Sequence, residues 1–116
     1  MSGDAFDTIT RFWQIQDAGD YTATAELFAE DAVFDDPMYG TFNGRDQIAA
    51  FMAKMNEVVT AQGGRFRAER ISGDETTAWA QWVFTSPERT MTGVGIYEVA
   101  GGEITYYRDY IDRNED

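Results

Sequence analysis

The chain has 116 residues, 43% of them apolar, and a net charge of −12 from 21 acidic and nine basic side chains. This length fits a single domain over residues 1–116 with one core, and the aromatic content (eight Phe, six Tyr, three Trp) argues against disorder. The negative charge would repel phosphate backbones and anionic lipid, so neither nucleic acid nor a membrane surface is an expected partner.

Two residue types are missing from the sequence, histidine and cysteine. Their absence excludes an imidazole base, a Ser-His-Asp triad, a disulfide framework and a thiolate nucleophile, and we expect no metal site and no cofactor. Acid–base chemistry would have to use carboxylates and phenols. No secretory signal and no apolar run of about 20 residues is visible, so the expected location is cytoplasmic.

The first half of the chain predicts three helices and one short strand. Helical spacing of apolar side chains predicts a helix over 4–18, a second over 21–30 with Asp20 as its N-cap, and a third over 45–62. Residues 31–37 predict a short strand that ends at Pro37, because proline donates no hydrogen bond to a sheet. The turn-rich segment 38–44 has room for a minor strand.

The second half predicts four strands over 65–71, 75–85, 89–99 and 103–112, separated by turn sequences. Trp79 and Trp82 have opposite parity in the second of these strands, so both of its faces are apolar. We expect one face to cover the helices and the other, outer face to form a homodimer.

The last of these strands carries the main functional candidate, Asp109. Side chains alternate along a strand, so Tyr107, Asp109 and Ile111 share one face, while Ile104 and its even-numbered neighbours share the other. A carboxyl that points into an apolar interior has a raised pKa and can transfer protons.

Five segments, in order, resemble the nuclear transport factor 2-like superfamily, in its SnoaL-like (polyketide cyclase) and ketosteroid isomerase-like branch: Asp17-Ala-Gly-Asp20, Leu27-Phe-Ala-Glu-Asp-Ala-Val33, Asp36-Pro37, Gly44-Arg-Asp-Gln-Ile48, and Gly102-Glu-Ile-Thr-Tyr-Tyr-Arg-Asp-Tyr-Ile-Asp112. The resemblance implies an α+β cone in α-α-β-α-β-β-β-β order, with a curved antiparallel sheet wrapped around a long helix, an apolar cavity and frequent dimerisation. It does not imply one activity, because this fold hosts isomerases, hydrolases, cyclases and non-catalytic binders.

The resemblance also assigns residues. Asp36 stands where ketosteroid isomerase-like members carry their base, but the positions of their oxyanion donors hold Phe12 and Val94, which donate nothing. Asp109 stands where limonene-epoxide hydrolase-like members carry one aspartate of an Asp-Arg-Asp set, whose other members are missing from 75–85. Neither mechanism is complete.

The remaining hypothesis pairs Asp36 and Asp109 as base and acid across an apolar cavity that binds a small, largely apolar molecule. The expected ligand-binding residues are Phe12, Phe34, Met38, Phe51, Met55, Gln81, Tyr97 and Tyr107, with one tryptophan of 75–85 in the wall. The glycines at 93 and 95 mark a bend in the sheet or room for a ligand.

Two alternatives stay open. Asp36 could only cap a turn and Asp109 could be a structural acid paired with an Arg or a Tyr hydroxyl. The protein would then be a non-catalytic dimerising or accessory domain whose cavity is filled by its own side chains, among them Trp13, Trp79 or Trp82.

Overall fold

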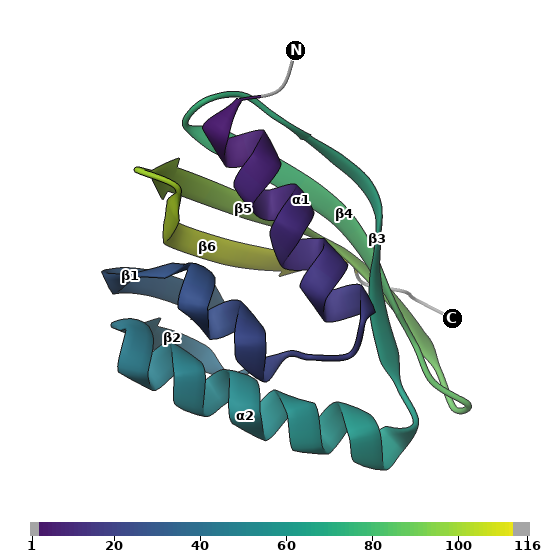
Figure 1. The fold of residues 1–116 in the computed structure, drawn as a ribbon. Helices are drawn as coiled ribbons and strands as arrows, with labels where there is room; N and C mark the ends of the chain where they lie inside the picture. Colours follow the sequence, from purple (N-terminus) through teal and green to yellow (C-terminus); the bar gives the residue numbers. More distant parts are fainter. Residues whose placement is uncertain (1–2, 113–116) are drawn as a thin grey trace.

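A computed structural model describes residues 3–112, which form one curved sheet with helices on its concave side (Figure 1). In chain order the elements are α1 (Asp4–Asp17), the 3-10 helix η1 (Thr22–Leu27), β1 (Phe28–Asp36), β2 (Gly40–Asn43), α2 (Arg45–Gln62), β3 (Arg65–Gly73), β4 (Thr77–Thr85), β5 (Thr90–Ala100) and β6 (Glu103–Ile111). The predicted α+β cone is confirmed.

The six strands lie in the order β2-β1-β6-β5-β4-β3, and all neighbours are antiparallel except β1 and β6, which are parallel. Figure 1 shows α1 lying across the half of the sheet that contains β3, β4 and β5, while α2 runs along β1 and β2. The inner face of the sheet and the apolar faces of the helices enclose the core and, as described below, the cavity.

The predicted second helix is wrong in type and extent. Only residues 22–27 are helical, as a 3-10 helix, and β1 begins at Phe28 rather than at 31. Asp20 does cap this turn, since its carboxylate accepts the N–H of Ala23 at 3.2 Å. A 3-10 helix holds only short segments, and the apolar residues that follow pair with β2 and β6 instead.

The alternation predicted for 103–112 is interrupted once. Tyr106 pairs with Glu98 and Ile104 with Val99, which leaves Thr105 unpaired as a bulge. The extra residue places Ile104 on the inner face together with Tyr107, and both are buried, so the prediction that they lie on opposite faces is wrong. Beyond the bulge, Tyr107 and Asp109 share a face as predicted.

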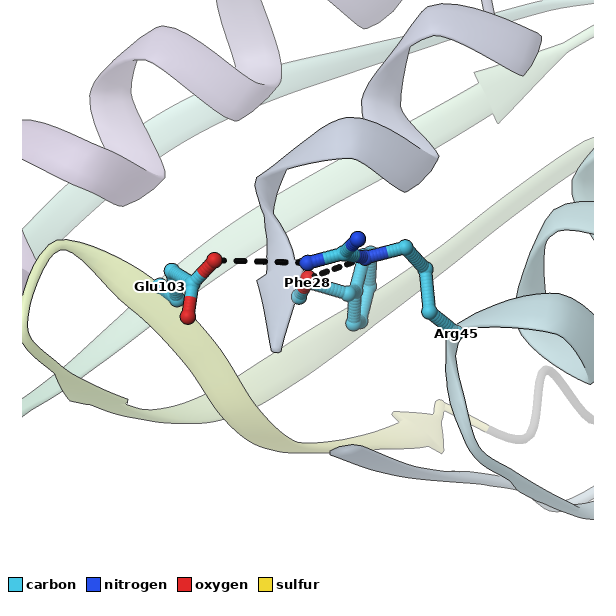
Figure 2. Close-up of polar contacts among 3 residues, drawn as sticks. All are labelled: Phe28, Arg45 and Glu103. Atoms are coloured by element: carbon cyan, nitrogen blue, oxygen red, sulfur yellow. Dashed lines mark hydrogen bonds and ion pairs between the residues drawn. The ribbon is translucent and has the colours of Figure 1, made fainter. Parts of the chain in front are cut away.

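Polar contacts fix the N-terminal ends of both long helices. The first N–H groups of α1, at Ala5 and Phe6, donate to carbonyls of the β3–β4 turn at 3.2 and 3.1 Å. At the start of α2, Arg45 donates to the Phe28 carbonyl at 2.8 Å and pairs with Glu103 at 3.3 Å (Figure 2). This arginine therefore ties α2 to the first residue of β1 and to the first residue of β6. Within residues 3–112, no helix combines the length and the hydropathy needed to cross a membrane.

Candidate functional site

A small cavity lies on the concave side of the sheet, as two adjoining chambers that we call inner and outer. The inner chamber, of about 50 Å³, is walled by buried and half-buried side chains of α1, α2 and the sheet, and by Tyr21, which directly precedes η1. The outer chamber, of about 60 Å³, reaches exposed residues at the β1–β2 turn and the β4–β5 turn. Six residues line both chambers: Asp36, Met55, Val59, Phe66, Trp82 and Asp109. Both candidate carboxyls are therefore at the junction.

Asp109 is fixed by two hydrogen bonds. The indole N–H of Trp82 donates to Oδ1 at 3.1 Å, and the hydroxyl of Tyr107 donates to Oδ2 at 3.0 Å. Burial raises the pKa of Asp109 from 3.8 to about 7, the Asp36 carboxylate adds to the increase, and the two hydrogen bonds oppose it by favouring the charged form. Near neutral pH the group can therefore carry or release a proton.

The position of Trp82 depends on a glycine directly opposite it in the sheet. Trp82 on β4 pairs with Gly93 on β5, and a Cβ at position 93 would overlap the indole ring and come within 2.5 Å of the Tyr110 carbonyl oxygen. The glycine thus lets the indole lie flat against the strand, with its N–H directed at Asp109.

A second glycine makes room for a buried tyrosine pair. Gly95 pairs with Asp109, and a Cβ there would lie 2.6 Å from the Tyr97 hydroxyl oxygen. Tyr97 and Tyr107 stack with ring centroids 4.3 Å apart, and Trp13 donates its indole N–H to the Tyr97 hydroxyl at 2.9 Å. Burial raises the pKa of both phenols well above the usual value, so both remain neutral donors and acceptors. The two glycines accommodate Trp82 and Tyr97 and leave that space to the protein rather than to a ligand.

Asp36 is the last residue of β1, and its side chain caps the turn that follows. Its Oδ1 accepts the N–H groups of Met38 and Tyr39 at 2.8 and 3.0 Å, which is the turn-capping role that the Asp-Pro sequence predicts. Burial raises the pKa of Asp36 above its usual value, against the lowering effect of these two bonds. Because Asp36 also lines both chambers, the capping role and exposure to the cavity occur together.

Of the eight predicted ligand-binding residues, five line the cavity. They are Phe34, Met38, Phe51, Met55 and Tyr107. The tryptophan of β4 in the wall is Trp82, whereas Trp79 lies on the outer face.

The other three predicted residues are outside the cavity lining. Gln81 is exposed on the outer face beside Val94 and Tyr110, because its parity in β4 is opposite to that of Trp82. Phe12 and Tyr97 are fully buried in the core, where the Phe12 ring packs against the Tyr97 and Tyr107 rings. None of the three contributes to the lining of either chamber.

Sequence reasoning missed several lining residues. The inner chamber includes Gln16 and Tyr21, and the outer chamber includes Tyr39, Gln62, Phe66, Phe84, Arg89 and Met91. A signal for Gln16 existed in its helical spacing, since it follows Phe12 by four residues and so lies on the buried face of α1. The residues of the outer chamber come from one helix, three strands and two turns, and had no sequence signal.

The titratable groups that line the cavity are the two carboxyls of Asp36 and Asp109 together with phenols and Arg89. Across residues 3–112, no group of three or more Asp or Glu side chains is placed to hold a metal ion. Two carboxyls with different surroundings face one cavity, and the more buried of them, Asp109, has the pKa of about 7. Such a pair can take a proton from one atom of a ligand and return it to another.

Comparisons with known proteins place the chain in a family. Residues 9–107 match the family model described as "SnoaL-like domain". A comparison with curated proteins found no match. A proposed ketosteroid isomerase from Kribbella flavida is 17% identical, with a TM-score of 0.82 over 97% of this chain and 81% of that one.

Two further solved structures have the same fold. A proposed polyketide cyclase from Xanthomonas campestris is 20% identical, with a TM-score of 0.75 over 94% of this chain and 90% of that one. An NTF2-like protein from Cytophaga hutchinsonii is also 20% identical, with a TM-score of 0.73 over 91% and 88%. The chain therefore belongs to the SnoaL-like domain family, and it has the fold of the solved NTF2-like protein.

Proposed function

We propose that the protein binds a small, largely apolar carbonyl compound in its cavity and moves a proton on it. The observation that carries this proposal is Asp109, a half-buried carboxyl held by Trp82 and Tyr107 at a cavity that it shares with Asp36. A purely structural acid gains nothing from a desolvated place beside a second carboxylate.

The two carboxyls take different roles because their surroundings differ. Asp36 keeps two backbone N–H donors that favour its ionised form, so it is the base that removes a proton from a carbon next to a carbonyl. Asp109, whose pKa is about 7, is the acid that delivers a proton to another atom of the ligand. Isomerisation, cyclisation and dehydration all use this pair of steps.

The lining sets the size and polarity of the ligand. Aromatic and methionine side chains supply most of the wall, and the only cationic side chain that lines either chamber in the described chain is Arg89, in the outer one. The chambers are small, so a single ring or a short branched chain is the expected ligand.

The test uses hydrogen exchange, which needs no knowledge of the natural substrate. Small cyclic ketones are incubated with the protein in D₂O, and incorporation of deuterium next to the carbonyl is followed by NMR. We expect exchange above the buffer rate, and its loss in Asp36→Asn and in Asp109→Asn by roughly 100-fold or more.

Asp35→Asn is the matched control. Asp35 is adjacent to Asp36, but its carboxylate pairs with Arg108 at 2.7 Å and it lines neither chamber, so exchange should stay unchanged. Exchange at the buffer rate with every ketone, or equal rates in all three variants, would contradict the proposal.

A second candidate is a non-catalytic accessory domain. The small volume of both chambers favours it, because Trp82 and Tyr107 already occupy much of the cone. It predicts no exchange and no chemical-shift change in the cavity residues when ketones are added.

For either function we propose a homodimer formed through the outer face of the sheet. Large apolar side chains are exposed there, on β4, β5 and β6: Trp79 (36%), Ile96 (38%) and Tyr110 (51%). Sedimentation equilibrium should show a dimer that Tyr110→Ser combined with Trp79→Ser converts to a folded monomer. A monomeric wild-type protein at all concentrations would overturn this.

A further inference from the structure

Gln16 is a polar side chain in an apolar setting. It lies on the face of α1 that also carries Ala5, Ile9, Phe12 and Trp13, and only 7% of it is exposed. The same residue lines the inner chamber. The residue is therefore largely withdrawn from bulk water and borders the cavity.

The carboxamide of Gln16 forms no hydrogen bond with any residue in the described range 3–112. Its N and O atoms keep some accessible surface, because Nε of Arg108 is the one fully enclosed side-chain polar atom without a partner in that range. Neighbouring buried polar groups differ in this respect: Trp13 donates to Tyr97, and the Thr24 hydroxyl donates to the Tyr21 carbonyl at 2.6 Å. Buried amide groups are nearly always paired, because an unpaired one loses its hydrogen bonds to water without replacement. An unpaired amide beside a cavity is thus available to whatever occupies the cavity.

A second polar group lies in the same chamber. Tyr21 is also buried and lines the inner chamber, and its hydroxyl oxygen accepts the Phe66 N–H at 3.3 Å. Since that bond uses the oxygen, the phenol proton is free to be donated. The inner chamber therefore offers donors on neutral groups and has no cation among its described lining residues.

We propose that the side-chain amide of Gln16 binds the carbonyl oxygen of a small, neutral ketone or aldehyde in the inner chamber. This inference rests on the proposed function for its setting, and it adds the ligand class and the residue that orients the ligand. The Gln16 N–H group donates to the carbonyl oxygen, which places the adjacent carbon toward the junction where Asp36 and Asp109 lie. When Asp36 removes the proton, negative charge develops on that same oxygen, where the amide donor stabilises it.

Gln16 would in this way supply the oxyanion donor that the sequence lacks at Phe12. Phe12 offers no hydrogen bond at the position where the resembling isomerases have a tyrosine, and Gln16 lies one turn further along the same face of the same helix.

A structural role for Gln16 makes the opposite prediction for stability. If the amide stabilised the fold, Gln16→Met would lower the melting temperature. If it serves a ligand, replacing an unpaired buried amide by an apolar side chain of similar length should leave the melting temperature unchanged or raise it.

The test compares two probes of nearly equal shape, cyclohexanone and methylenecyclohexane, of which only the first has a hydrogen-bond acceptor. Affinities are measured by NMR titration on the wild type, on Gln16→Met and on Gln14→Met, a control at an exposed position of the same helix. The wild type and Gln14→Met should prefer the ketone, and Gln16→Met should lose roughly three- to tenfold of that preference. The side-chain NH₂ resonances of Gln16 should shift only with the ketone.

Three outcomes would overturn the inference: an equal preference in Gln16→Met and wild type, an unshifted Gln16 NH₂ signal at saturation, or no binding of either probe. The binding ratio needs no turnover, so the two ideas fail separately. If the ketone preference depends on Gln16 but no deuterium exchange occurs, the proton transfer alone is refuted. If exchange occurs and Gln16→Met leaves it intact, the role of Gln16 alone is refuted.

Discussion

The two faces of the sheet use the same residue types in different ways. On the inner face of β4, Trp82 is 3% exposed and donates to Asp109, whereas Trp79 on the outer face of the same strand is 36% exposed, with no side-chain hydrogen bond to any residue in 3–112. On β6, Asp109 faces the cavity, and Arg108 next to it faces outward and pairs with Asp35. One step along a strand therefore separates an acid that faces the cavity from an ion pair on the outer face.

The difference shows what gives a carboxyl unusual properties in this fold. Asp35 and Asp109 each have a close polar partner, but a cation neutralises Asp35, whereas Asp109 has only neutral donors and a second acid nearby. The partner type and the burial, rather than the number of hydrogen bonds, raise the pKa of Asp109.

The largest effect is expected from Asp109→Asn as the pH changes. Because the pKa of Asp109 is raised in the folded state, the folded protein holds a proton that the unfolded chain has released, so the contribution of Asp109 to stability falls as the pH rises from about 4 to about 7. A pKa of about 7 corresponds to about 4 kcal/mol over this range. The free energy of unfolding of Asp109→Asn, measured by urea denaturation, should lack this decline.

Asp112→Asn, at an exposed position three residues further along, is the control and should keep the wild-type pH dependence. Parallel stability curves for wild type and Asp109→Asn would show that the inner face does not desolvate this carboxyl.

A smaller loss is expected from Gly93→Ala. The added methyl group would collide with the Trp82 ring and with the Tyr110 carbonyl oxygen, and the backbone oxygen cannot turn away. The free energy of unfolding should fall by about 3 kcal/mol. Gln81→Ala on the outer face should change it by no more than about 0.5 kcal/mol, and an equally small effect for Gly93→Ala would show that the indole does not need the glycine.

The smallest change is expected from Trp82→Phe compared with Trp79→Phe. The first removes the N–H that favours ionised Asp109 and leaves a gap, so stability should fall by about 1–2 kcal/mol and the pKa of Asp109 should rise further. The second should change neither quantity. Titration of the Asp109 carboxyl, followed by carbon-13 NMR, measures the pKa. Equal pKa values in both variants would show that the Trp82 N–H does not influence the ionisation of Asp109.

The sequence alone determined the elements that have a regular pattern of apolar residues or clear turn sequences at their ends. The apolar stripe of 45–62 gave α2 its bounds, the turn sequences separated the strands of the second half, and five short motifs gave the family. Strand parity placed Tyr107 and Asp109 on one face, since beyond the Thr105 bulge the alternation is regular. The motifs also identified both carboxyls.

Only the tertiary structure decided which of these residues meet. The bulge moved Ile104 to the inner face, the 3-10 turn replaced a helix, and Gln81 proved to face outward because Trp82 occupies the inner side. Helical spacing places Gln16 on the buried face of α1, but only the packing of α1 over the sheet brings Gln16, and Tyr21 after it, to the cavity. The pKa of Asp109 likewise depends on burial by side chains from other elements, and so it is a property of the folded assembly of strands and helices rather than of the segment in which it lies.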